Sequence, residues 1–106
     1  MKLSVLERFA VLGILPERGT LITMTVAKNI RNLVEPGEAE QEKLELRQVG
    51  DQLGWNPEAA KEMEIEVEWT GPQSKLLVEA LEKLDKDGKL LTAHLSLCEK
   101  FGIGKA

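Results

Sequence analysis

The sequence contains a single cysteine, no tyrosine, two tryptophans and two phenylalanines. One thiol cannot close a disulfide within its own chain, so a disulfide scaffold is excluded and a reducing compartment is favoured. No apolar run approaches the length of a membrane span. The first apolar run is interrupted by Glu7 and Arg8, which is the pattern of an amphipathic helix and not of a signal peptide. We therefore expect a cytoplasmic protein that does not associate with membranes.

A glycine-rich phosphate loop is also missing. The nine glycines stand at the expected ends of elements, and no strand leads into a glycine-rich turn followed by a helix. Nucleotide-dependent chemistry is therefore not expected, and no other pattern calls for a cofactor.

The chain is long enough for one hydrophobic core and too short for two. Its 106 residues are 42% hydrophobic and 30% charged, close to ordinary globular usage. We expect a single domain over residues 1–106, with residues 101–106 as a flexible tail.

The net charge of −4 is distributed unevenly. Residues 1–34 carry five basic and two acidic side chains, and residues 70–106 carry six basic and five acidic ones. Residues 35–69 carry three basic and eleven acidic side chains. The acidity therefore belongs to the middle third, which concerns the choice of partners and not the fold.

Capping and turn signals divide the chain into short elements. Ser4 with Glu7 and Thr70 with Gln73 form capping boxes, each of which begins a helix. Gly50 opens a two-residue turn between strand-like segments. The predicted helices span residues 4–14, 21–34, 37–43, 57–61, 72–87 and 92–101, and the predicted strands span residues 44–49, 52–55 and 63–69.

These elements indicate an α+β fold. We expect a small three-stranded antiparallel sheet, made of a hairpin and one further strand, covered on one face by the first, second and fifth helices. The helical and strand periodicities predict this core: Val5, Leu6, Phe9, Leu12, Ile22, Val26, Ile30, Leu33, Leu46, Ile65, Val67, Leu77, Leu81, Leu84, Leu95 and Phe101.

His94 and Cys98 are four residues apart on the last predicted helix and share a face. They are conceivable as two ligands of a metal site, but no further ligand stands at a suitable spacing. As a base and a nucleophile they would need an orienting third group, which the sequence does not offer. We expect a partly exposed helix histidine and a buried core thiol, and therefore no metal site and no catalytic residues.

Three carboxylates stand on one face of the clearest strand. Glu64, Glu66 and Glu68 alternate with Ile65, Val67 and Trp69. A solvated edge-strand face is the ordinary explanation, and a docking surface for a basic partner is the alternative.

Trp55 and Trp69 each end a strand-like segment. Core packing is the default role for such residues, and a place in a protein interface is the sharper alternative. The candidate partner-binding residues are accordingly Glu64, Glu66, Glu68, Trp55 and Trp69.

Three helices followed by a hairpin is also the element order of a winged helix, a nucleic-acid-binding fold. In that fold the third helix reads the DNA groove. Here the third helix would be residues 38–43, which are short, acidic and of the wrong charge to face phosphates. The basic side chains of the second predicted helix, Lys28 and Arg31, are too few to reverse this unfavourable charge. Binding to nucleic acid is therefore kept only as the alternative.

The N-terminal residues 1–9 (MKLSVLERF) and 15–19 (LPERG) resemble the start of a group of small uncharacterised phage and prophage proteins. The segments 81–85, 91–97 and 99–101 resemble the C-terminal pattern of that group, although Cys98 stands where an aromatic residue is expected. The resemblance implies a phage or prophage setting and, because the group has no assigned activity, no functional residues.

Together these observations predict a non-enzymatic, phage-type accessory protein that binds another protein or itself. A winged-helix-like regulator that binds nucleic acid is the alternative. A third reading, in which the acidic strand imitates DNA, needs more carboxylates over a longer surface than the chain provides.

Overall fold

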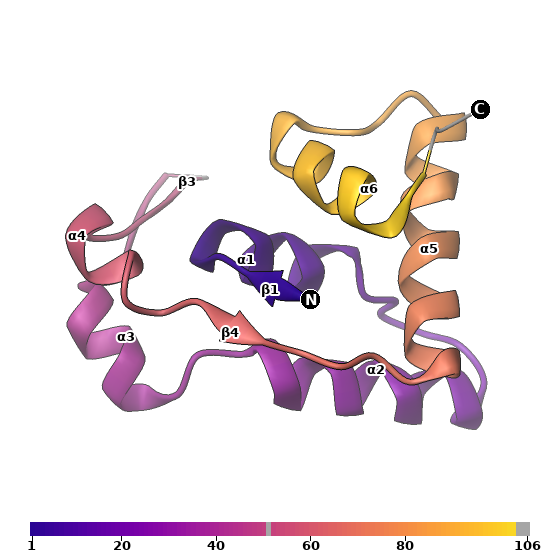
Figure 1. Cartoon of the computed structure of the whole chain (residues 1–106), viewed down its shortest axis with the longest axis horizontal. Helices are drawn as coiled ribbons and strands as arrows, with labels where there is room; N and C mark the ends of the chain where they lie inside the picture. The colour runs from indigo at the N-terminus through magenta and orange to yellow at the C-terminus, as the bar shows by residue number, and fades with distance from the viewer. Residues whose placement is uncertain (51, 104–106) are drawn as a thin grey trace.

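The computed structural model of the chain describes residues 1–50 and 52–103. Helices predominate in this part of the chain, and each predicted helix is found close to its predicted bounds (Figure 1). In chain order the elements are β1 (Lys2–Leu3), α1 (Val5–Ile14), α2 (Leu21–Val34), α3 (Glu38–Leu44), β2 (Arg47–Val49), β3 (Gln52–Gly54), α4 (Pro57–Ala60), β4 (Ile65–Glu66), α5 (Gly71–Lys86), the 3-10 helix η1 (Thr92–His94) and α6 (Leu95–Phe101).

The predicted capping signals begin the helices in the structure. The Ser4 hydroxyl accepts from the backbone N–H of Glu7, and the Glu7 carboxylate accepts from the backbone N–H of Ser4. Thr70 and Gln73 make the same reciprocal pair at the start of α5. Because these bonds satisfy N–H groups that have no partner inside the helix, they fix where α1 and α5 begin.

The fold is α+β, but the predicted three-stranded sheet is wrong. β2 and β3 form the expected antiparallel hairpin, while β4 pairs with β1, which the sequence analysis missed. The predicted strand over residues 63–69 is reduced to Ile65–Glu66. The strand pairs with the first residues of the chain in place of the hairpin. Met1 and Val67 exchange two hydrogen bonds and thereby extend the β1–β4 pairing. The hairpin forms a separate two-stranded sheet.

The β2–β3 hairpin projects from the α3 and α4 side of the molecule (Figure 1). Gly50 has a φ of 63°, in the left-handed region that the first position of such a turn requires. Asp51, the second predicted turn residue, lies outside the described residues.

Helices α1, α2, α5 and α6 enclose the main core, with α1 in the middle (Figure 1). The first three were expected to pack on a sheet and instead pack mainly on one another. The buried members are Leu3, Val11, Leu15, Ala27, Ile30, Val34, Val67, Leu77, Leu81, Leu97 and Cys98.

A second, smaller cluster lies under α3, α4 and the hairpin. Its buried residues are Val5, Leu44 and Met63, and Phe9 and Trp55 pack against them. Since Val5 and Phe9 belong to α1, one helix contributes to both clusters, and the chain forms a single globule.

The predicted core is correct in part. Val5, Ile30, Val67, Leu77 and Leu81 are buried as expected. The following predicted core residues are only half-buried: Phe9, Leu12, Val26, Leu46, Ile65, Leu84 and Phe101.

Four predicted core residues are exposed, and for these the prediction is wrong: Leu6, Ile22, Leu33 and Leu95. In α2 the helical period was right and the phase was wrong. The buried face of α2 runs through Ala27, Ile30 and Val34; apolar residues stand on several sides of this helix, so the period alone does not select the buried side.

The predicted flexible tail began at residue 101. Phe101 ends α6, and Ile103 packs against the main core and donates its backbone N–H to the carbonyl of Cys98. Residues 104–106 lie outside the described part of the chain.

Candidate functional site

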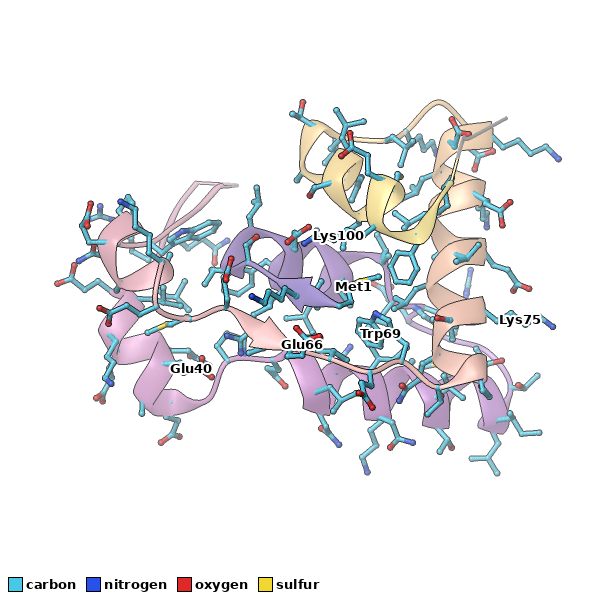
Figure 2. All side chains as sticks on the ribbon, in the orientation of Figure 1. Met1, Glu40, Glu66, Trp69, Lys75 and Lys100 are labelled. Carbon is cyan, nitrogen blue, oxygen red and sulfur yellow. The ribbon has the colours of Figure 1, made fainter. Side chains whose placement is uncertain are left out.

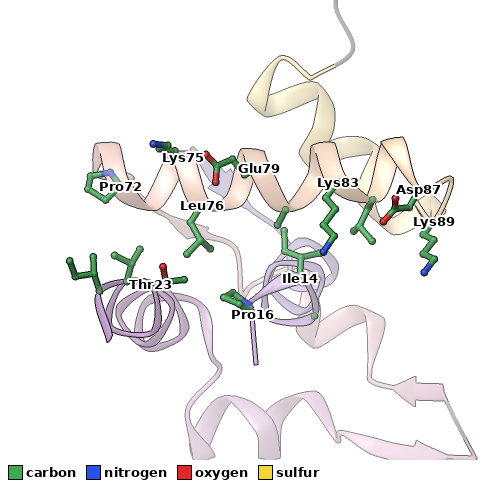
Figure 3. Close-up of a pocket in the computed structure, with 15 residues that line it drawn as sticks. Ile14, Pro16, Thr23, Pro72, Lys75, Leu76, Glu79, Lys83, Asp87 and Lys89 are labelled. Atoms are coloured by element: carbon green, nitrogen blue, oxygen red, sulfur yellow. The ribbon is translucent and has the colours of Figure 1, made fainter. Parts of the chain in front are cut away.

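An open groove of about 760 Å³ runs along α5 where this helix crosses the end of α1 and the first turns of α2 (Figure 3). Its apolar lining comes from all three helices: Ile14, Pro16, Ile22, Val26, Pro72, Leu76, Ala80 and Leu84. Such a concave apolar surface, half-buried at most positions, is suited to contact with another apolar surface.

The sequence builds this groove from the spacing of residues on α5. Pro72, Leu76, Ala80 and Leu84 recur every four residues and so follow one side of the helix. Leu77 and Leu81 stand on the neighbouring side and are fully buried in the main core. The helix therefore has two apolar sides: the chain itself buries one of them fully and covers the other only in part.

Charged side chains of alternating sign also line the groove: Lys75, Glu79, Lys83 and Asp87, which we call the charge stripe. All four are exposed, and Figure 3 shows Lys83 pointing toward Ile14 across the groove. Lys89 adds a further positive charge at the same end as Asp87.

Two large apolar side chains protrude beside the groove at the start of α2. Leu21 is 85% exposed and Ile22 is 78% exposed, the highest values among the exposed large apolar residues. Ile22 belongs to the lining of the groove. Removing such adjacent apolar side chains from water is favourable, so they mark a candidate contact surface.

The three predicted acidic residues are exposed and do not form one surface with the groove. Glu64 and Glu68 flank β4. The Oε1 atom of Glu66 forms an ion pair with the α-amino nitrogen of Met1 at 3.0 Å (Figure 2). The Glu66 carboxylate thus contributes to the β1–β4 pairing, while Glu64 and Glu68 face solvent.

The two tryptophans lie in different clusters. Trp55 packs against Phe9 with ring centroids 5.3 Å apart, in the smaller cluster. Trp69 lies against Met1, with its indole N–H 3.3 Å from the Met1 sulfur, and its ring centroid is 6.3 Å from that of Phe101 (Figure 2). Both side chains are half-buried, and neither tryptophan is among the residues that line the groove.

His94 and Cys98 are engaged in the structure of the chain itself. The Nδ1 of His94 accepts a hydrogen bond from the backbone N–H of Leu91 at 3.0 Å, at the start of η1. Both side chains are buried, whereas the histidine was expected to be partly exposed. Burial, with a smaller contribution from Asp85, raises the pKa of the Cys98 thiol, which favours its protonated form.

Within residues 1–50 and 52–103, no group of three or more histidine, cysteine, aspartate or glutamate side chains is arranged to hold a metal ion. The helices in this part of the chain include none that is both long and apolar enough to cross a membrane.

Two acidic side chains, Glu7 and Glu40, have lowered pKa values. The guanidinium of Arg8 donates hydrogen bonds to Glu40, and this contact holds the pKa of that carboxyl below its usual range. Burial by itself would raise the pKa of Glu7, but hydrogen bonds from Lys100 and from the backbone of Ser4 outweigh it and lower the pKa. These two carboxylates are therefore ionised parts of the fold.

The helix that a winged-helix reading would place in a DNA groove is short and acidic. α3 has seven residues, and the shallow hollow beside it is lined by Glu38, Gln41, Glu42, Glu45 and Leu46. It packs against α4, while α2 packs against α1 and α5.

The groove was not among the predicted sites. The signal that could have found it is the pair of four-residue repeats on α5, one apolar and one of alternating charge, which are visible in the sequence. No protein-family model, curated protein or solved structure matches this chain.

Proposed function

We propose that this protein is a non-enzymatic binding module whose α5 groove receives an amphipathic helix from a protein partner. The observation that carries this proposal is the partly exposed apolar side of α5, bordered by the protruding Leu21 and Ile22. A helix with small apolar side chains flanked by charges of both signs would match the apolar lining and the charge stripe.

The chemistry of the other candidate groups supports a binding role over an enzymatic one. The Nδ1 of His94 already accepts a backbone hydrogen bond, and the Cys98 thiol is buried with a raised pKa. Neither residue lines the groove. A nucleophile or a general base would need access to a substrate, which these positions do not favour.

A protein partner also fits the charges better than nucleic acid does. Glu38, Glu42 and Glu45 would present carboxylates to phosphates if α3 entered a DNA groove. The α5 groove instead carries both signs of charge, which suits a protein surface.

The resemblance of residues 1–9, 15–19, 81–85, 91–97 and 99–101 to small phage and prophage proteins supports an accessory role in the cytoplasm of an infected or lysogenic host cell. In that setting the acidic faces at Glu64 and Glu68 are a second candidate contact for a basic partner, together with Trp55 and Trp69 where they are exposed.

The test compares the full chain with an Ala80→Arg variant, which places a long charged side chain in the groove. Glu82→Lys is the matched control, because Glu82 is exposed on the same helix and does not line the groove. Each protein is immobilised and exposed to a host-cell extract and to the chain itself, and every retained protein is then purified and titrated directly.

We expect at least one protein, or the chain itself, to bind the wild type and the control and to lose at least tenfold in affinity with Ala80→Arg. A chain that binds no protein, or a partner that binds Ala80→Arg unchanged, contradicts the proposal.

A further inference from the structure

We propose that the occupant of the α5 groove is a second copy of this chain, with the two α5 helices antiparallel and centred at the level of Leu81. This inference deepens the proposed function and rests on it. Its basis is the order of signs along the charge stripe, Lys75, Glu79, Lys83 and Asp87.

The charge stripe is complementary to itself when one copy is reversed. In an antiparallel pair centred on position 81, Lys75 lies opposite Asp87 of the second copy. In the same arrangement Glu79 lies opposite Lys83. The two-fold axis repeats both contacts, so all four positions of each stripe face a charge of opposite sign. From Lys75 to Asp87, the residue that caps the end of α5, the stripe covers thirteen residues, or about 18 Å along the helix axis, which is enough to fix a register.

Two neighbouring alignments bring like charges together. In a parallel pair with equal register, each residue of the stripe faces its own copy. An antiparallel pair shifted by one four-residue repeat places Glu79 opposite Glu79 or Lys83 opposite Lys83. Because like charges in contact are unfavourable, these alignments are disfavoured, and only the antiparallel pair centred on position 81 gives every position of both stripes a partner of opposite sign.

The charges of the stripe are not satisfied within one chain. Spacing of four residues would allow intrahelical ion pairs, yet none is formed among these side chains in α5 and Asp87, all of which the structure describes. They are therefore free to meet charges from outside.

The apolar residues are placed to follow the same symmetry. Leu21 and Ile22 protrude at the Pro72 end of the groove, where Figure 3 shows Thr23 of α2 below Pro72. An antiparallel pair brings this end opposite the Asp87 end of the second copy. The protruding pair of one copy then reaches the apolar lining of the other near Leu84, and the contact is made twice.

The surface area of the chain is consistent with such a contact. The accessible surface is 7428 Å², whereas a folded monomer of 11.8 kDa is expected to expose about 5900 Å². An interface of ordinary size buries about 800 Å² on each partner, which is smaller than this difference.

The experiment measures the mass of the full chain by sedimentation across concentrations up to the millimolar range. We expect a mass of twice 11.8 kDa at the upper concentrations. Glu79→Lys places two lysines in contact across the pair, and Lys83→Glu places two glutamates in contact. Each variant alone should raise the dissociation constant about tenfold or more, because two symmetric contacts change sign.

Mixing the two variants is the decisive arm. In a mixed pair every position of the charge stripe again faces an opposite charge, so a dimer containing one copy of each should form with near wild-type affinity. The double variant Glu79→Lys with Lys83→Glu should restore self-association for the same reason. Glu82→Lys is the control and should leave the dissociation constant unchanged. Restoration by mixing also shows that each variant is folded.

The outcomes separate this inference from the proposed function. A wild-type chain that remains at 11.8 kDa at millimolar concentration overturns the self-association. A dimer that Ala80→Arg dissociates but that the charge variants do not alter overturns the antiparallel register. In either case the proposed function stands if another protein binds the groove and is lost with Ala80→Arg.

Discussion

Arg8 and Glu40, from α1 and α3, form a two-pronged ion pair across 32 residues of sequence. One guanidinium nitrogen lies 2.9 Å from Oε2 of Glu40, and the other lies 3.2 Å from Oε1. The same guanidinium donates to the backbone carbonyls of Val34 and Met63. Since Arg8 is 2% exposed, one buried cation joins α1 to the end of α2, to α3 and to the segment before β4.

Replacing Glu40 by alanine should therefore destabilise the protein strongly. The substitution leaves the Arg8 guanidinium buried with two backbone acceptors and without its counterion. Loss of one partner of a buried pair costs about 3–5 kcal/mol, and the partial exposure of Glu40 places the expected loss near the lower value, about 3 kcal/mol. Urea unfolding followed by circular dichroism measures this change. Glu42→Ala, at an exposed position on the same helix, should change the free energy of unfolding by less than about 0.5 kcal/mol.

The stability should also fall in acid because of Glu40 and Glu7. The pKa of each carboxyl is lowered from its ordinary value of 4.5, so the folded state binds the proton more weakly than the unfolded state does. The resulting stabilisation is complete above the unfolded pKa and is lost as the pH falls through the lower, folded pKa. Unfolding midpoints measured from pH 7 down to pH 3 should drop below about pH 4.5. A Glu40→Gln variant, although less stable at pH 7, should show a shallower drop; an identical pH profile would contradict the role of Glu40.

Local signals predicted the helices well because they are read from a few neighbouring residues. The reciprocal bonds of Ser4 with Glu7 needed no knowledge of the rest of the chain. The strand pairing did need it: nothing in the alternation of Ile65 and Glu66 indicates that the partner is Leu3, more than sixty residues away. The sequence analysis likewise took Arg8 as a sign that the first helix has a polar side. Its burial could not be foreseen, because the carbonyls that accept its hydrogen bonds belong to distant segments of the chain.

The groove illustrates the same limit for function. The apolar repeat on α5 was visible, but sequence periodicity does not say which side of a helix with two apolar sides the chain covers. That depends on where α1 and α2 cross α5, and hence on long-range packing around Leu77 and Leu81.

The two tryptophans should report on two parts of the fold separately. Trp55 belongs to the smaller cluster with three buried apolar residues, and Trp69 contacts the main core. Because the smaller cluster buries less apolar surface, it should open at lower free energy than the main core. In a Trp69→Phe variant, urea should change the Trp55 fluorescence before the helical circular dichroism signal is lost. A Trp55→Phe variant should show Trp69 fluorescence and circular dichroism changing together, and coincident curves in both variants would disprove separate opening.

Gly88 follows α5 and has a φ of 68°, in the left-handed region. A side chain there would meet no atom within 4 Å, so the cost of Gly88→Ala is conformational and should be about 1 kcal/mol. Thermal unfolding should detect it as a lower midpoint. Gly88→Asn should be better tolerated than Gly88→Ala, because asparagine adopts this conformation more readily. Gly71→Ala is the matched control, since its added Cβ is equally unobstructed and its φ is not positive; an equal loss at both positions would rule out the conformational explanation.

Exposed apolar residues that serve an interface should be replaceable without loss of monomer stability. Leu21→Gln combined with Ile22→Gln removes the protruding pair from α2 while keeping a residue that favours helix. Because both side chains are almost fully exposed, the free energy of unfolding of the monomer should change by less than about 0.5 kcal/mol at each position. The dissociation constant of the dimer should nevertheless rise at least tenfold, since each copy loses the apolar contact that it makes with the other. Leu91→Gln controls for general surface hydrophobicity, because Leu91 is 65% exposed and lies outside the groove. Equal weakening by the control would mean that the association is non-specific, and unchanged association of the α2 variant would exclude Leu21 and Ile22 from the contact.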